Sequence, residues 1–286
     1  MSYLDRIAEC RRWVSDDYRP FAIDDMDLGR VTDDFAHRLA AFPKVFDVSE
    51  HGVSLVPELS GFAERTGAVA DVLRRLKDAG GIPRWRDEAY PVLRRWGDAP
   101  LLTMERAAVP LFGVRAYGVH LNGFVDGPEG LRLWVARRAK TKATAPGKLD
   151  HLVAGGQPHG LGVKANLIKE CEEEAGLPAA VAARAVPVGL VSYRCAREEG
   201  LRDDVLFCFD LELPADFTPS NADGEVESFA LWPLPRVLET IRGTDDFKFN
   251  VALVILDFAV RHGLLGPDDS DYEEIVAGLR LPPEAT

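Results

Sequence analysis

Residues 169–176 read KECEEEAG, and this short segment constrains the chain more than any other. Glu170, Glu173 and Glu174 are spaced i, i+3 and i+4, which on an α-helix places three carboxylates within about 100° of arc on one face. Carboxylates that close repel one another unless positive charge lies between them. A hard divalent cation meets that need, because it prefers oxygen ligands. The spacing therefore predicts a metal site.

The residues around these glutamates predict an amphipathic helix over 163–175. Cys171 falls on an apolar face beside the carboxylates and is expected to be a buried small side chain. Gly176 stands where glycine favours the end of a helix. Gly155, Gly156 and Gly160 precede the helix, and we expect them to let the backbone turn back towards its N-terminus.

Composition narrows the classes of function. The chain has 286 residues and a formal net charge of −12, which opposes non-specific nucleic-acid binding because that requires a basic surface. No segment approaches the roughly 20 apolar residues of a membrane span. The N-terminal residues lack the apolar core of a signal peptide, and the four cysteines form no CxxC pair. We expect a cytoplasmic protein without nucleic-acid or membrane partners.

Hydrophobic periodicity predicts an α+β chain in two domains, residues 1–107 and 108–286. The first is expected to contain helices over 4–14 and 62–79 and strands over 45–48 and 53–56. The second is expected to form a mixed sheet with helices packed on it. Its predicted elements are strands over 117–125, 131–136, 186–195, 205–213 and 225–232, a polar loop over 196–204, and a helix over 250–262 with Asn250 as its N-cap.

Residues 155–177 resemble the signature of the Nudix (MutT-like) hydrolases, which is a glycine, a loop and a helix carrying Arg-Glu-aliphatic-x-Glu-Glu-x-Gly. The matching residues are Gly155, Lys169 in place of the arginine, the metal-binding glutamates Glu170, Glu173 and Glu174, and Gly176-Leu177. Lysine keeps the charge and loses the bidentate fork of arginine. Leu161 stands where the family has a loop glutamate. The resemblance implies a Nudix α/β/α sandwich, Mg2+ or Mn2+ on the three glutamates, and hydrolysis of a small-molecule diphosphate.

Further motifs resemble a Nudix subgroup that carries an extra N-terminal domain and is fused to thiamine pyrophosphokinase in some fungi. They are residues 85–88 (WRDE), 105–107 (ERA), 118–123 (GVHLNG), 136–138 (ARR), 146–150 (PGKLD) and 247–250 (FKFN). The subgroup implies hydrolysis of thiamine diphosphate, or of its damaged analogues, to the monophosphate. Alternatives are a pyrophosphatase for ADP-ribose or a dinucleotide, and a catalytically silent nucleotide-binding regulator. Because many Nudix hydrolases are dimers, the resemblance is also compatible with a homodimer.

Positive charge is concentrated between residues 137 and 148, just before the glycines. If Arg137, Arg138 and Lys148 line the cleft, they can hold the diphosphate. A basic run of this kind is equally typical of a solvated loop. Gly155 and Gly156, together with His159 in the loop that follows them, complete the residues expected to bind substrate.

The general base is expected to be a carboxylate, either one of the helix glutamates or one from a loop. Glu225 and Glu227 alternate along a predicted strand, so only one of them should face the cleft. Glu225 is preferred because it adjoins the loop at 221–224.

Overall fold

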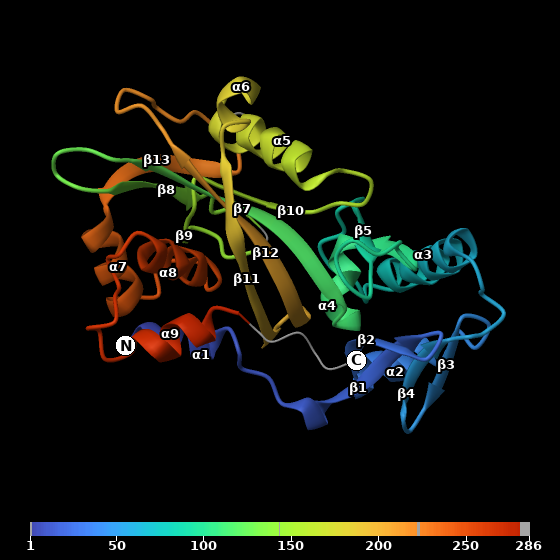
Figure 1. Ribbon diagram of the computed structural model, residues 1–286. Helices are drawn as coiled ribbons and strands as arrows, with labels where there is room; N and C mark the ends of the chain where they lie inside the picture. The colour runs from blue at the N-terminus through green and yellow to red at the C-terminus, as the bar shows by residue number, and fades with distance from the viewer. Residues whose placement is uncertain (1, 143, 222–223, 281–286) are drawn as a thin grey trace.

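The computed structural model describes residues 2–142, 144–221 and 224–280 (Figure 1). In its first part, four strands form a sheet in the order β2-β1-β4-β3, and β5 pairs with β6. The elements of this part are α1 (Tyr3–Glu9), η1 (Ser15–Asp17), β1 (Tyr18–Ile23), β2 (Met26–Thr32), α2 (Asp33–Leu39), β3 (Phe46–Ser49), β4 (Gly52–Leu55), α3 (Phe62–Asp78), β5 (Ala89–Val92), β6 (Leu102–Glu105), η2 (Arg106–Ala108) and α4 (Val109–Phe112).

The second part of the described chain is built on a seven-stranded mixed sheet. Five strands follow the order β11-β12-β7-β8-β13, while β10 pairs with β7 and β9 with β8. The β12–β7 pair is parallel and the others in this sheet are antiparallel. The elements are β7 (Arg115–Val125), β8 (Arg132–Arg138), β9 (Leu149–Asp150), β10 (Val153–Gly156), α5 (Val163–Ala175), α6 (Ala179–Ala182), β11 (Val186–Arg197), β12 (Gly200–Glu212), β13 (Val226–Pro233), α7 (Leu234–Gly243), α8 (Val251–Arg261) and α9 (Tyr272–Gly278).

Helices cover both faces of this sheet, so the expected α/β/α sandwich is confirmed (Figure 1). Successive side chains of a strand point to opposite faces. On β12, Phe209 packs in the cluster under α5, whereas Cys208 packs in the cluster that contains α8. The two clusters therefore lie on opposite sides of one sheet. The glutamate helix α5 and the short helix α6 cover one face, and α7 and α8 cover the other.

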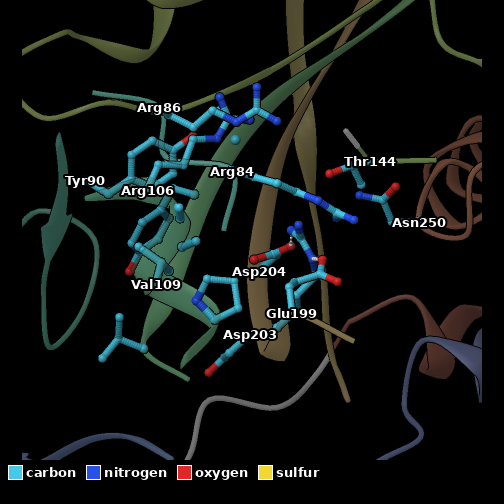
Figure 2. Close-up of a pocket in the computed structure, with 18 of the residues that line it drawn as sticks. Arg84, Arg86, Tyr90, Arg106, Val109, Thr144, Glu199, Asp203, Asp204 and Asn250 are labelled. Carbon is cyan, nitrogen blue, oxygen red and sulfur yellow. Dashed lines mark hydrogen bonds and ion pairs between the residues drawn. The ribbon is translucent and has the colours of Figure 1, made fainter. Parts of the chain in front are cut away.

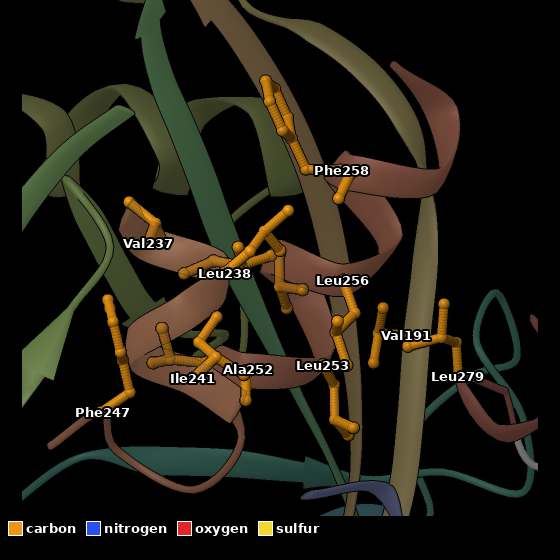
Figure 3. Close-up of a cluster of buried hydrophobic side chains, with 14 of the residues drawn as sticks. Val191, Val237, Leu238, Ile241, Phe247, Ala252, Leu253, Leu256, Phe258 and Leu279 are labelled. Atoms are coloured by element: carbon orange, nitrogen blue, oxygen red, sulfur yellow. The ribbon is translucent and has the colours of Figure 1, made fainter. Parts of the chain in front are cut away.

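The cluster under α7 and α8 is shown in Figure 3, where Leu253 and Leu256 of α8 pack beside Val191 of β11. Helix α1 joins this cluster, because Ile7 is buried there and Arg6 donates a 2.8 Å hydrogen bond to the Ile241 carbonyl. A separate cluster fills the first part of the chain, from residue 21 to residue 114. The domain boundary near residue 107 stays a prediction.

Two expectations about local structure were wrong, and a third was confirmed. The first helix ends at Glu9, because Cys10 caps it and is itself buried, with its thiol donating to the Phe249 carbonyl. Residues 196–204 are not a loop, because β11 and β12 extend to a tight turn at residues 198–199. Asn250 is the N-cap residue of α8, as expected, although its side chain donates to the Tyr193 hydroxyl and makes no capping hydrogen bond.

The polar composition of 196–204 misled because its charges are paired within the sheet. Arg194 of β11 lies 2.5 Å from Asp203 of β12, and Arg202 lies 3.3 Å from Asp204 on the same strand. Paired charges of this kind are compatible with a strand. No helix within the described ranges is both long enough and apolar enough to span a bilayer.

Candidate active site

Helix α5 brings the expected glutamates to the edge of the sheet beside β10. Its apolar side chains, Leu167 and Cys171 among them, are fully buried against the sheet. Glu174 is buried as well, and its carboxylate accepts a 2.8 Å hydrogen bond from the Ala154 amide. The Glu170 side chain is 14% exposed and lies over Gly155, whereas Glu173 is 48% exposed.

The two glycines at the end of β10 serve a different purpose from the expected turn. Gly155 and Gly156 pair with β7 as ordinary strand residues, and Gly160, at φ +83°, lies in the loop that follows. A Cβ on Gly155 would lie 2.6 Å from Oε2 of Glu170. A Cβ on Gly156 would overlap the Tyr90 hydroxyl and lie 2.8 Å from its Cζ. Both glycines therefore make room for side chains, and the expected turn lies at Gly160 and not at Gly155 and Gly156.

The donor set fits a hard divalent cation, although the three glutamates do not yet converge. Lys169 Nζ lies 3.1 Å from Glu170 and 2.7 Å from Glu173, so an ammonium partly fills the role expected of the metal. Within residues 2–142, 144–221 and 224–280, no three His, Cys, Asp or Glu side chains are grouped to hold a metal ion. Glu173 would join the other two carboxylates only when its ion pair with Lys169 opens.

Burial makes these carboxylates poor places for uncompensated negative charge. Desolvation is the largest influence on Glu174, and with the nearby charges of Asp150 and Glu170 it raises the pKa of Glu174 to about 8. Desolvation likewise raises the pKa of Glu170 above its usual value. Gly155 adds a backbone position with no side chain directly beneath the Glu170 carboxylate. Oxygen donors in need of positive charge, next to open backbone, are the features that suit a divalent cation.

Glu225 lies near Glu174. It forms an ion pair with Lys142, and both residues line a cavity of about 10 Å³ together with Glu174. Glu227 is exposed. The structure therefore brings Glu225, and not Glu227, to the glutamate helix, while its role as a general base stays a prediction.

The basic run and His159 are used in local contacts. Arg138 is buried and lies 2.7 Å from Asp150, Arg137 donates a 2.9 Å hydrogen bond to the Gly147 carbonyl, and Lys148 donates to the Asp245 carbonyl. The His159 ring packs on Phe62, with 5.7 Å between centroids. Of the described residues that line the large cavity, none is one of these four. Their substrate-binding role stays a prediction.

A cavity of about 470 Å³ lies where the first part of the chain meets the sheet of the second part. Its walls include Gly155 and Gly156, next to the glutamate helix. Several cations line it, namely Arg84, Arg86, Arg106, Arg202 and Lys248. Figure 2 shows Arg86, Tyr90 and Arg106 gathered on one side, with Arg84 extending across towards Asn250.

Two of these arginines are available to a ligand. Within the described residues, neither the Arg84 nor the Arg86 guanidinium makes a hydrogen bond or an ion pair with another side chain. Among the acidic groups on the opposite wall, Glu199 lies 2.7 Å from Arg202, and Asp203 is bonded to Arg115 and Arg194. The cavity therefore offers free positive charge on the side formed by residues 84–106.

Sequence reasoning had missed these cavity residues as a binding site. Arg86 and Arg106 do stand inside the motifs at 85–88 and 105–107 that resemble the Nudix subgroup. Those motifs were a usable signal, but nothing in their local pattern indicates that they face Gly155 and Gly156.

Comparisons with known proteins agree with this geometry. The model of the Domain of unknown function (DUF4743) matches residues 2–116. Nudix hydrolase 20, chloroplastic, from Arabidopsis thaliana is 44% identical over 97% of this chain and 77% of that protein. Nudix hydrolase 24, chloroplastic, from the same plant is 43% identical over the same shares of the two chains. An uncharacterized protein of Saccharomyces cerevisiae is 33% identical over 84% of this chain and 75% of its own length.

Solved structures that are similar to this chain include a MutT protein from Methanosarcina mazei Go1. Its TM-score is 0.39 and its sequence identity is 19%, and the match covers 52% of this chain and 95% of that one. The Nudix domain of Shewanella oneidensis NrtR, in complex with ADP ribose, has a TM-score of 0.42, 15% identity, and coverage of 54% and 91%.

The fold, the glutamate helix and the close similarity to the plant proteins together define a hydrolase. The chain belongs to the Nudix hydrolase family and carries an additional N-terminal domain. Its activity is hydrolysis of a diphosphate linked to another group, and enzymes of this family generally use divalent metal ions.

Proposed function

We propose that this enzyme hydrolyses thiamine diphosphate, or damaged analogues of it, to the monophosphate with Mg2+ or Mn2+. The observation that supports the reaction is the 470 Å³ cavity, because its wall at Gly155 adjoins Glu170. Arginines in the same cavity can neutralise a diphosphate. The choice of thiamine rests on the resemblance of the motifs at 85–88 and 105–107 to the subgroup associated with that cofactor.

Each carboxylate has a distinct place in the proposed reaction. Glu170 and Glu174 would hold the metal, and Glu173 would join them once Lys169 moves away. A divalent metal in such a site lowers the pKa of bound water and neutralises phosphate oxygens. Glu225, which forms an ion pair with Lys142 near Glu174, is the proposed general base.

The size of the cavity suits a diphosphate joined to a heterocycle, since ligand pockets usually measure about 300–1,000 Å³. Apolar side chains, including Val109, Leu111 and Leu206, line it beyond the cations. These surfaces would accept an organic ring as well as a nucleoside. ADP-ribose, dinucleotides and nucleoside diphosphates are therefore the competing substrates.

The proposed substrate is tested by a phosphate-release screen with the full chain and Mg2+ or Mn2+. The substrates are thiamine diphosphate, its oxidised and oxy analogues, ADP-ribose, NADH, dinucleoside polyphosphates and nucleoside diphosphates. We expect the highest kcat/KM for a thiamine diphosphate analogue. A higher value for a nucleotide would reject the thiamine proposal, and no turnover with any substrate would favour a silent nucleotide-binding regulator.

The sequence and the cavity each indicate a different arginine, Arg137 or Arg84, for substrate binding. From the sequence, we expect Arg137→Ala to raise KM for the best diphosphate substrate by severalfold. From the cavity, we expect the same of Arg84→Ala, because that guanidinium is exposed in the cavity and unpaired within the described residues. Steady-state kinetics of both variants decides between them, and an unchanged KM in either one removes that residue from the binding site.

Two further expectations remain predictions. The cytoplasmic location was inferred from the N-terminal sequence, whereas both plant relatives are named as chloroplastic. The homodimer is checked by sedimentation of the purified chain, and a single monomeric species at micromolar concentration would contradict it.

A further inference from the structure

The Tyr90 hydroxyl is a buried polar group with no partner. The residue is 5% exposed, and its oxygen makes no hydrogen bond within the described residues. Buried polar groups are normally hydrogen-bonded, so an exception in a cavity wall points to a missing ligand. The residue lines the large cavity from β5, in the first part of the chain.

Tyr90 is held against β10, the strand that lies under α5. Its hydroxyl lies against Gly156, whose missing Cβ leaves the space that it occupies. Gly155, the preceding residue, provides the same kind of space for the Glu170 carboxylate. Because successive residues of a strand face opposite sides of the sheet, Tyr90 and Glu170 lie on the two sides of β10 at the same point along it.

Arg106 adds positive charge at the same point. Its guanidinium carbon lies 5.5 Å from the centre of the Tyr90 ring and would be 3.4 Å from a Cβ on Gly156. Glu88 accepts a 2.7 Å hydrogen bond from one terminal nitrogen and so fixes the orientation of the group. Figure 2 shows Arg106 and Tyr90 together, with Arg86 above them.

We propose that Tyr90 and Arg106 form a phosphoryl-binding subsite, so that the N-terminal domain completes the active site of the hydrolase. The proposal rests on the proposed function, because the ligand is a phosphoryl group of the diphosphate substrate. The Tyr90 hydroxyl and the Arg106 guanidinium both donate to phosphoryl oxygens placed in the cavity beside Gly156. The N-terminal domain thereby acquires a role in catalysis by positioning.

An oxyanion matches these two donors better than a neutral or cationic group. A phenol and a guanidinium together supply O–H and N–H donors, and a guanidinium offers no acceptor. Arginine is also the side chain whose planar donors best match phosphate oxygens. A cationic ring placed here would face Arg106 and, above it, Arg86.

The test measures binding of methylenediphosphonate, a diphosphate analogue with a bridge that resists hydrolysis. Calorimetric titration of the full chain with Mg2+ is compared for the natural sequence, Tyr90→Phe and Arg106→Lys. We expect Kd to rise at least fivefold in each variant, while the melting temperature of Tyr90→Phe stays the same or rises. A hydroxyl without a partner contributes nothing to the stability of the free protein, so its loss costs binding alone.

Matched controls come from the same residue types away from the cavity. Tyr18→Phe in β1 and Arg74→Lys on α3 are expected to bind the analogue like the natural sequence. A Kd within twofold of the natural value in both Tyr90→Phe and Arg106→Lys would overturn the subsite. So would an absence of binding by the unaltered protein. If one of the two variants does not fold, the other decides the question by the same threshold.

The subsite and the proposed function fail in different ways. Turnover of a diphosphate by the natural sequence, with unchanged Kd and KM in both variants, removes the subsite and leaves the function in place. Weaker binding in both variants, in a protein that hydrolyses none of the screened substrates, keeps the subsite and removes the proposed function.

Discussion

Replacement of Glu170 by glutamine is expected to reduce kcat/KM by at least about a hundredfold, the effect of losing one electrostatic group at a reacting centre. Glutamine has nearly the shape of glutamate but lacks the negative charge that a divalent cation requires. Glu170 is the carboxylate over Gly155, a residue that also lines the large cavity. Its loss therefore affects the phosphoryl group most directly.

The control for this variant is Glu172→Gln on the same helix. Glu172 is exposed and points away from the sheet, so its replacement is expected to leave kcat/KM unchanged. Steady-state kinetics at saturating Mg2+ and thermal melting should be measured on both proteins. Full activity in a folded Glu170→Gln variant would exclude this residue as a metal ligand.

Gly155→Ala is expected to cause a loss of similar size by a purely steric route. The new Cβ would lie 2.6 Å from Oε2 of Glu170, well inside van der Waals contact, so the carboxylate or the strand must move. A displacement of about 1 Å at a reacting centre can cost a hundredfold in rate. Overpacking of this kind also costs about 1–3 kcal/mol of stability.

Gly162→Ala is the matched control in the same region of the chain. A Cβ at Gly162 meets nothing within 4 Å, and its φ of −70° suits any residue. We expect nearly full activity from this variant, with a stability loss of no more than about 1 kcal/mol at the N-cap. Equal activities for the two alanine variants would show that the space under Glu170 is not required.

The comparison of the two kinds of replacement separates charge from geometry. Glu170→Gln removes the charge and keeps the position, whereas Gly155→Ala keeps the charge and disturbs the position. If both variants lose activity, catalysis requires Gly155 because the absence of a side chain leaves space for the Glu170 carboxylate. The sequence had instead predicted a turn of the backbone at this glycine.

Much of the second domain could be predicted because its signals are local. The periodicity of α5, the left-handed Gly176 that ends it and the burial of Cys171 all follow from neighbouring residues on one helix. The hairpin of β7 and β8 and the strand at β13 were likewise visible as apolar runs between turn residues.

Other elements were hidden because their stability comes from distant partners. β1 and β2 carry mixed polarity and are half-buried, so they give little alternation to detect. Arg138 looked like a substrate ligand, yet it is buried beside Asp150 of a different strand. An arginine that forms an ion pair inside the fold cannot be told from an arginine that binds a ligand by the sequence around it.

By itself, the sequence determined the glutamate helix, the alignment of its carboxylates on one face and, through its motifs, the Nudix family. The first two features depend on the spacing of residues within one 13-residue helix. Only the tertiary structure decided that Tyr90 and Arg106 lie beside Gly156, and that Lys169 occupies the space between two glutamates. The physical reason is that these contacts form between side chains brought together by packing, which no local periodicity encodes.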